Sequence, residues 1–164
     1  MGEKKHKGKK KERGEKKRRG GWGWLIALVV GASAVTILWR VWFAGASIPY
    51  GDPEAIARGA ALYAANCTSC HGQRAEGEDP FSPMGGRKPN GEILAPSLDG
   101  FGHAWHHPPE ELSTVIRRGS SQPGSRMLGF EERLSEEDVR SVIAYMHSIW
   151  PKAIQQRYLT QPHH

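Results

Sequence analysis

The clearest helical periodicity of the chain lies near its end, after Ser135. Apolar side chains recur there three and four positions apart, at Val139, Val142, Ile143 and Met146. This spacing is typical of an amphipathic helix with one buried face. Ser135, with an acidic Asp138 three positions later, forms a variant capping box that starts the helix, and Pro151 limits it.

Two further helices are predicted earlier in the chain. Leu112, Val115 and Ile116 form an apolar stripe in a segment that opens at Pro109 and stops near Gly119. The other helix is indicated by its start signal, in which Asp52 is the N-cap, a proline occupies the first turn and an acidic residue follows. We expect this helix to run over residues 53–66. Between the helices, residues 72–108 and 120–134 form loops rich in Gly, Pro and polar side chains.

A different apolar pattern occupies residues 22–39, which carry no charge. A run of this length is about sufficient to cross a bilayer, and tryptophans flank it on both sides, at Trp22, Trp24, Trp39 and Trp42. We therefore predict one transmembrane anchor over residues 21–44. The competing interpretation is a signal peptide cut after Ala46, since Ala44-Gly45-Ala46 resembles a signal-peptidase site. The apolar run is longer than the usual signal-peptide core, which favours the anchor.

The charge distribution sets the orientation of this anchor. The formal net charge is +6, but residues 1–20 contain eight Lys, three Arg and three Glu and alone carry +8. Apart from this tail and Arg40, the remainder carries −3, so the sequence indicates no nucleic-acid partner. We predict that 1–20 is a disordered basic tail that stays in the cytoplasm, as a topology signal or in contact with lipid headgroups.

The remaining domain boundaries follow from this layout. A linker over residues 45–52 leads to the external domain, which we predict to span 53–151. Residues 152–164 are predicted to be a polar C-terminal tail. With the tail in the cytoplasm, everything after about residue 44 lies outside, on the other side of the membrane.

The external domain carries the run Cys67-Thr68-Ser69-Cys70-His71, which has the spacing of a covalent haem attachment site. Two cysteines three positions apart share one face of a helical turn, so both thiols can add to the vinyl groups along one porphyrin edge. His71 is then close enough for its imidazole to reach the iron.

Other chemistry at these cysteines is less well supported. A zinc site of this type needs a second pair of Cys or His ligands at suitable spacing, and the chain has only two cysteines. A thioredoxin-like redox motif needs a βαβ context, and no strand pattern flanks this one. A disulfide between Cys67 and Cys70 would close a very small, strained loop.

Taken together, these features resemble the class I cytochrome c family over about residues 52–151. The segments that carry the resemblance are the helix before the motif with Gly59 and Tyr63, the run Ala95-Pro96-Ser97-Leu98, the run 124–130 around Met127, and the end of the last helix from Tyr145 to Pro151. One departure is Leu128, where family members often have a proline after the ligand methionine.

The resemblance implies an all-α, class I cytochrome c-like helical domain around one covalently bound haem, here preceded by one transmembrane helix. Its first and last helices would cross near Gly59 and Tyr145. Cys67 and Cys70 would carry the thioethers of a haem c, and His71 and Met127 would be the axial ligands of the iron. The carbonyl of Pro96 would accept a hydrogen bond from the His71 ring.

The second axial ligand has alternatives. Met84 lies early in the loop, and His103, His106 and His107 offer bis-His ligation, although surface or propionate contact is the ordinary role of such a cluster. Met146 falls on the apolar stripe of the last helix and is expected in the core. Arg117, Arg118 and Arg126 are candidate partners of the haem propionates.

These features point to an electron-transfer protein rather than an enzyme. We expect a membrane-tethered carrier of single electrons between membrane redox proteins, from a reductase to an oxidase or another acceptor. The alternative is a fixed haem c subunit of a larger membrane dehydrogenase or oxidase complex. A ligand-binding haem sensor or peroxidase-like enzyme would need an open sixth position at the iron. The Met127 loop disfavours this alternative, because the methionine would occupy that position.

Overall fold

The structure is a computed structural model that describes residues 28–31, 33, 36 and 47–160. The predicted basic tail 1–20 and most of the predicted anchor 21–44 lie outside the described residues. The described positions between 28 and 36 are helical, and the Ser33 hydroxyl donates to the Val29 carbonyl. Within the described residues, no helix combines the length and apolar character that a membrane crossing requires.

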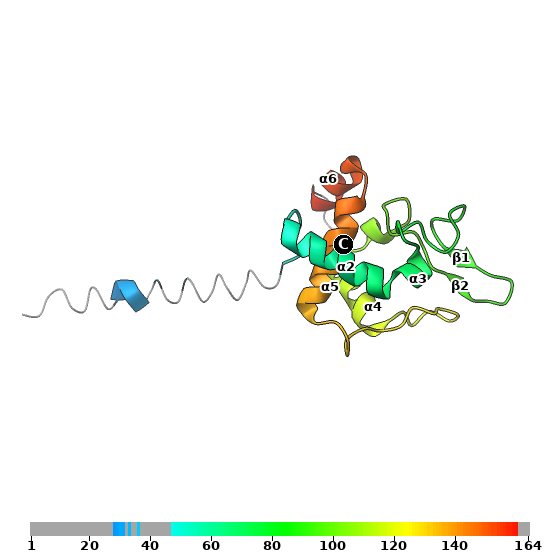
Figure 1. Ribbon diagram of the computed structural model, residues 1–164, viewed down its shortest axis with the longest axis horizontal. Coiled ribbons are helices and arrows are strands. Elements are labelled where there is room, and N and C mark those ends of the chain that lie inside the picture. Colours follow the sequence, from blue (N-terminus) through cyan, green and yellow to red (C-terminus); the bar gives the residue numbers. More distant parts are fainter. Residues whose placement is uncertain (1–27, 32, 34–35, 37–46, 161–164) are drawn as a thin grey trace, which may run out of the picture. The chain divides into compact units, whose positions relative to one another are not determined.

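The part from residue 47 onward is mostly helical (Figure 1). Its elements are α2 (Pro53–Asn66), α3 (Thr68–His71), β1 (Gly86–Arg87), β2 (Ile93–Leu94), the 3-10 helix η1 (Ala104–His106), α4 (Pro109–Arg118), α5 (Glu136–Ile149) and α6 (Lys152–Thr160). The predicted start of α2 is confirmed, because the Asp52 side chain accepts a hydrogen bond from the Glu54 amide. The capping box of α5 is confirmed as well, with Ser135 and Asp138 each bonding the other's backbone amide.

Helices α2 and α5 cross in close contact, as expected from Gly59 and Tyr145. A Cβ atom at Gly59 would lie 2.0 Å from the carbonyl oxygen of Ser141, so only glycine lets the two backbones approach this closely. The rings of Tyr63 and Tyr145 pack beside this point with their centroids 5.3 Å apart. The crossing holds the end of α2, and with it the cysteine motif, against the core.

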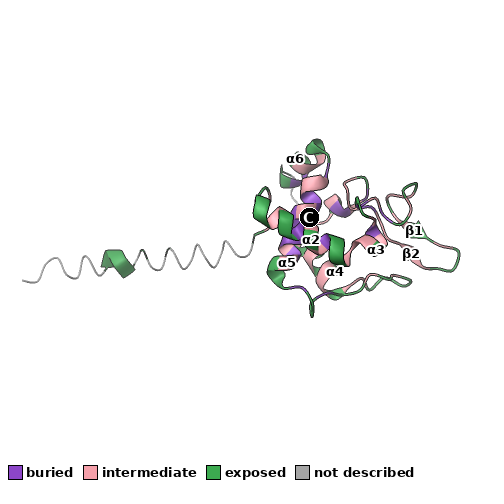
Figure 2. Ribbon diagram, viewed as in Figure 1, coloured by how far each residue is buried: buried purple, intermediate pink, exposed green. Residues whose placement is uncertain are grey.

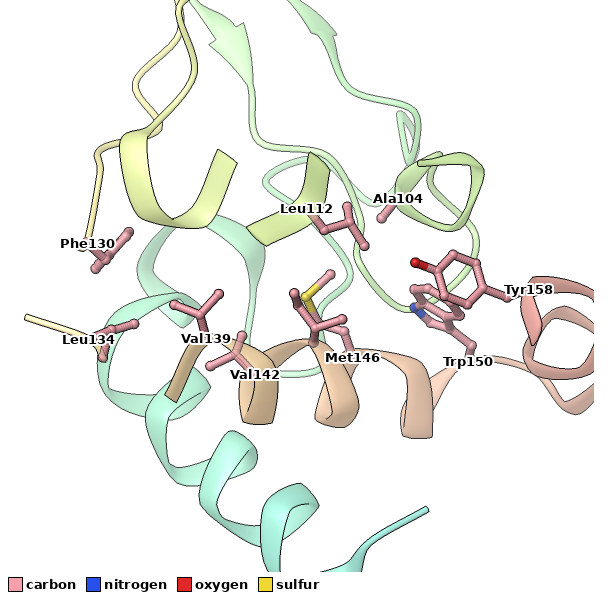
Figure 3. Packing of buried hydrophobic residues seen from close by; sticks show 10 residues of the cluster. Ala104, Leu112, Phe130, Leu134, Val139, Val142, Met146, Trp150 and Tyr158 are labelled. Carbon is pink, nitrogen blue, oxygen red and sulfur yellow. The ribbon is translucent and has the colours of Figure 1, made fainter. Parts of the chain in front are cut away.

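The core lies on the inner face of α5 (Figure 2). Val139, Val142, Ile143 and Met146 are all at most 3% exposed, which confirms the predicted apolar stripe. Figure 3 shows side chains of this stripe pointing toward Leu112 of α4. Burial of this continuous apolar surface is the main stabilising term of the domain.

The prediction of a polar tail after residue 151 is wrong as far as residue 160. Residues Lys152–Thr160 form α6, and Tyr158 on this helix is 3% exposed. The Tyr158 hydroxyl donates to the carbonyl of His107 at 3.1 Å, and its ring packs edge-on against Trp150. Pro151 ends α5 but also begins α6, because its carbonyl accepts from the amides of Ile154 and Gln155. Proline is favourable at a helix start, so the residue taken as a stop also begins an element.

The all-α prediction also needs a small correction. Strands β1 and β2 pair antiparallel, with Gly86 opposite Leu94 and Arg87 opposite Ile93. Each strand has two residues, too few for an alternating pattern to be recognised in the sequence. The hairpin and η1 lie within the region 72–108 that was predicted as a loop.

Candidate functional site

The two cysteines lie at the junction of α2 and α3. The Cys67 amide still bonds to the Tyr63 carbonyl of α2 at 2.9 Å, and the His71 amide bonds to the Cys67 carbonyl at 2.9 Å. The motif is therefore held in one continuous helical turn. No disulfide joins Cys67 and Cys70. Burial, followed by the neighbouring Cys70, raises the pKa of Cys67 to about 11, so this thiol is protonated at neutral pH and is a poor thiol-exchange nucleophile.

His71 is oriented by one hydrogen bond from its ring. Its Nδ1 atom lies 2.8 Å from the carbonyl oxygen of Pro96, the contact that the family resemblance implied. A carbonyl can only accept, so Nδ1 carries the proton and the lone pair of Nε2 remains available for a metal. The side chain is 8% exposed, and burial lowers the pKa of His71 despite the opposing effect of the Pro96 bond. The imidazole is thus neutral at pH 7, as metal ligation requires.

The segment around Gly77 places the Pro96 carbonyl. Gly77 has a φ angle of +84°, and its amide donates to the His71 carbonyl at 2.8 Å. A Cβ atom there would lie 2.8 Å from the Ser97 nitrogen and 3.0 Å from the Ala95 oxygen. The absence of a side chain at Gly77 lets the loop that follows the motif pack directly on the segment that contains Pro96.

Met127 is held by a loop that folds back on the end of α4. Its carbonyl accepts from the Ser120 amide at 3.2 Å, and its amide bonds to the Ser125 hydroxyl at 3.2 Å. Gly119 ends α4 with a φ angle of +81° and pairs with Leu128 in an isolated β-bridge. The Met127 side chain packs against the hydrophobic core.

One cavity of about 750 Å³ brings all five predicted site residues together. They are Cys67, Cys70, His71, Pro96 and Met127. Apolar side chains of α4, among them Leu112 and Ile116, complete the wall. The volume lies in the range of cofactor pockets, and two thiols, a neutral imidazole and a thioether are the donor set that a c-type haem needs.

The alternative ligands differ in how they relate to this cavity. Met84 lines it but is 57% exposed. His103 and His107 line it too, and Nδ1 of His107 lies 3.1 Å from the Glu111 carboxylate. His106 is not part of the lining and stacks on Trp105 at a centroid distance of 3.7 Å. The Met127 side chain packs against the core, and this favours Met127 over Met84 and the three histidines as the second axial ligand.

Two of the three arginines that were predicted as candidate partners of the haem propionates form ion pairs with glutamates of the domain. Arg126 lines the cavity, but its guanidinium pairs with Glu78 and Glu92. Arg117 pairs with Glu136 at 3.2 Å. Arg87 and Arg133 line the cavity without having been singled out, since no pattern in the sequence separates them from other surface arginines.

Comparison with known proteins gives one family. Residues 54–146 match the model of the family described as cytochrome c oxidase, cbb3-type, subunit III. Among solved structures, cytochrome cL from the marine methylotrophic bacterium Methylophaga aminisulfidivorans is similar, with 20% identity over 68% of this chain and 69% of that chain and a TM-score of 0.46. The family match contains all five predicted site residues.

Proposed function

Because the chain belongs to the family of cbb3-type cytochrome c oxidase subunit III, we propose that it is a membrane-tethered carrier of single electrons on the periplasmic side of a bacterial cytoplasmic membrane. The matched region is a cytochrome c domain, and the protein is a monohaem c-type cytochrome, an electron carrier and not an enzyme. Its cofactor is one covalently attached haem c. The observation that carries the proposal is that the cysteine motif and Met127 line one and the same cavity.

Each site residue has a role in this proposal. Cys67 and Cys70 would carry the two thioethers of the haem, and His71 and Met127 would hold its iron. The carbonyl of Pro96 fixes the orientation of the His71 ring through the 2.8 Å contact to Nδ1. The bound haem supplies an iron that changes reversibly between the ferrous and ferric states.

The protein side of the site favours electron transfer over chemistry at the iron. A methionine bound to the iron would exclude oxygen and peroxide and would raise the reduction potential relative to bis-His ligation. The apolar side chains of α4 that line the cavity limit the access of water, which further tunes the potential.

The membrane tether rests on the sequence. The uncharged run 22–39, the tryptophans beside it and the +8 tail support a single span with a cytoplasmic N-terminus. Tethering in the bilayer would raise the effective concentration of the cytochrome near membrane-bound reductases and oxidases.

The family description favours a second candidate function. It names a subunit of an oxidase, and a domain of this kind also fits a haem c subunit held permanently in a larger membrane complex. Both functions use the same site, and they differ in whether the protein leaves its partners.

Detergent extraction of native membranes separates the two functions. A tethered carrier is expected to run on a sizing column alone, with its covalent haem, at the size of one chain in detergent. A fixed subunit would co-elute with other subunits in moderate salt. A chain from these membranes without covalent haem would contradict both functions.

A further inference from the structure

Four charged side chains form an ionic network beside the cavity, which we call the Glu78 network. Its members are Glu78, Lys88, Glu92 and Arg126. The Lys88 ammonium lies 2.5 Å from Glu78 and 3.4 Å from Glu92. The Arg126 guanidinium pairs with Glu78, and its Nε atom lies 3.6 Å from Glu92. The network thus joins three segments of the chain, which are the loop after the cysteine motif, the β1–β2 hairpin and the Met127 loop.

On one side, Glu78 is attached to the segment that holds His71. Its amide donates to the Ala95 carbonyl at 3.0 Å, and its carboxylate accepts from the Ala95 amide at 3.2 Å. Ala95 directly precedes Pro96, whose carbonyl orients the His71 ring. The Lys88 ammonium, helped by the Ala95 amide and Arg126, lowers the pKa of Glu78, so the carboxylate is charged at neutral pH.

On the other side, Arg126 directly precedes Met127. Two further hydrogen bonds join the β1–β2 hairpin to the Met127 loop. The Ile93 amide of β2 donates to the Gly124 carbonyl at 2.8 Å, and the Arg87 guanidinium donates to the Pro123 carbonyl at 2.8 Å. A Cβ atom at Gly124 would lie 2.2 Å from the Gly91 oxygen, so the two loops are in close contact. The Met127 loop is therefore held by the hairpin as well as by α4.

We propose that Glu78 and Arg126 are positioning residues that tie the segment holding His71 to the segment holding Met127 and so keep Met127 at the iron. The inference rests on the proposed roles of His71 and Met127 as axial ligands. Neither positioning residue has to touch the haem. A charge-assisted pair of this kind acts by lowering the population of states in which the Met127 loop has moved away from the cavity.

The test is the substitution Glu78→Gln in the full-length protein with its haem. The amide oxygen of glutamine can still accept from the Ala95 amide, while the charge that faces Arg126 and Lys88 is lost. We expect cyanide to bind to the oxidised protein about tenfold faster, because cyanide enters when Met127 leaves. The absorption band of the sulfur–iron bond should weaken in the same variant.

The matched control is Glu137→Gln. Glu137 also pairs with an arginine, Arg58, at 2.9 Å, but it does so at the α2–α5 crossing. This control should leave the cyanide rate unchanged, and thermal unfolding of both variants measures any general loss of stability. A Glu78→Gln protein that folds and binds cyanide at the parental rate would overturn the proposal.

A double-mutant cycle gives a second, independent test. If Glu78 and Arg126 act through each other, Arg126→Gln also accelerates cyanide binding. The double variant should then bind cyanide at about the same rate as either single variant. Fully additive effects of the two substitutions would contradict the proposal. The unsubstituted parent protein shows whether the positioning proposal has failed or the assignment of Met127 as a ligand has failed. A parent without a sulfur–iron band that binds cyanide at once has no methionine ligand, which overturns both.

Discussion

At the scale of single residues, the assignment of the sixth ligand has the clearest consequence. Replacing the proposed ligand by Met127→Ala removes the thioether and opens the sixth position. Since axial ligands move haem potentials over about 0.8 V in proteins, we expect the potential to fall by on the order of 0.1 V. The reduced variant should also bind carbon monoxide. Potentiometry measures the fall in potential, and absorption spectra detect the bound carbon monoxide.

The control for this substitution is Met84→Ala. Met84 lines the same cavity but is 57% exposed, so its loss should leave the potential and the sixth position as they are. If Met84→Ala and not Met127→Ala opens the iron, Met84 is the ligand.

Gly77 is a second residue at which one atom decides the geometry of the site. In Gly77→Ala, the new Cβ lies within 3.0 Å of three backbone atoms in the segment 95–97, and φ stays at +84°. We expect a loss of about 2–3 kcal/mol in the free energy of unfolding, from left-handed strain and overpacking together. Denaturant unfolding of the haem-loaded protein measures it.

Gly91→Ala separates the two causes. Gly91 has nearly the same φ angle, +86°, but a Cβ there meets nothing within 4 Å. Its substitution should therefore cost only the strain, about 1 kcal/mol. Equal losses at both positions would show that contact with the Pro96 segment contributes nothing.

At the scale of elements, the start of α5 should make stability depend on pH. Hydrogen bonds from Ser135 and then from Arg58 lower the pKa of Asp138. A carboxyl whose pKa is lower in the folded state stabilises the fold above its unfolded value of about 3.9, and this contribution disappears as the pH falls through the folded value.

The substitution Asp138→Asn tests this contribution. We expect the variant to be about 1 kcal/mol less stable than the parent at pH 7. The difference should begin to shrink as the pH falls below about 4, where the unfolded carboxyl becomes protonated, and should disappear as the pH falls through the lower pKa of the folded carboxyl. Denaturant unfolding over this range measures it, and a difference that is constant with pH would assign the effect to shape and not to charge.

Helix α6 should be an integral part of the domain. Tyr158 is 3% exposed and packs against Trp150, so Tyr158→Ala is expected to cost about 3 kcal/mol or more. Leu159 on the same helix is 57% exposed, and Leu159→Ala should cost less than about 1 kcal/mol. Thermal unfolding compares the two, and similar small losses would mean that α6 contributes little to stability.

At the scale of the whole molecule, the proposed membrane anchor predicts how the chain behaves when membranes are washed. If the run 22–39 is a retained anchor, the chain should stay with membranes through washes at high salt and high pH. A variant that begins at Ser47 behind a cleavable signal peptide should be released as a soluble cytochrome. Release by the washes of a shortened, haem-containing chain that begins at Ser47 would instead favour cleavage after Ala46.

The distribution of charge matters at this scale as well. The tail carries +8, Arg40 adds +1 and the remainder carries −3, so the net charge of +6 describes none of these parts. Some of the carboxylates that the structure describes form ion pairs within the domain, as in the Glu78 network and the pairs of Arg58.

The sequence by itself determined the features that depend on neighbouring residues. The bounds of α2 and α4, the capped start of α5 and its buried stripe follow from caps and periodicity, because these act within a few positions. The spacing of Cys67, Cys70 and His71 is local too, and it was sufficient to predict a covalently attached haem.

Only the tertiary structure decided the features that join distant segments. Glu78 and Arg126 are 48 positions apart, and Tyr158 and His107 are 51 positions apart. Their pairing leaves no periodic signal, so the Glu78 network, the docking of α6 and the two-residue strands were not predicted. The meeting of Met127 and the cysteine motif in one cavity depends likewise on how α4, α5 and the loops pack, since burial and long-range contacts arise only when the chain has folded.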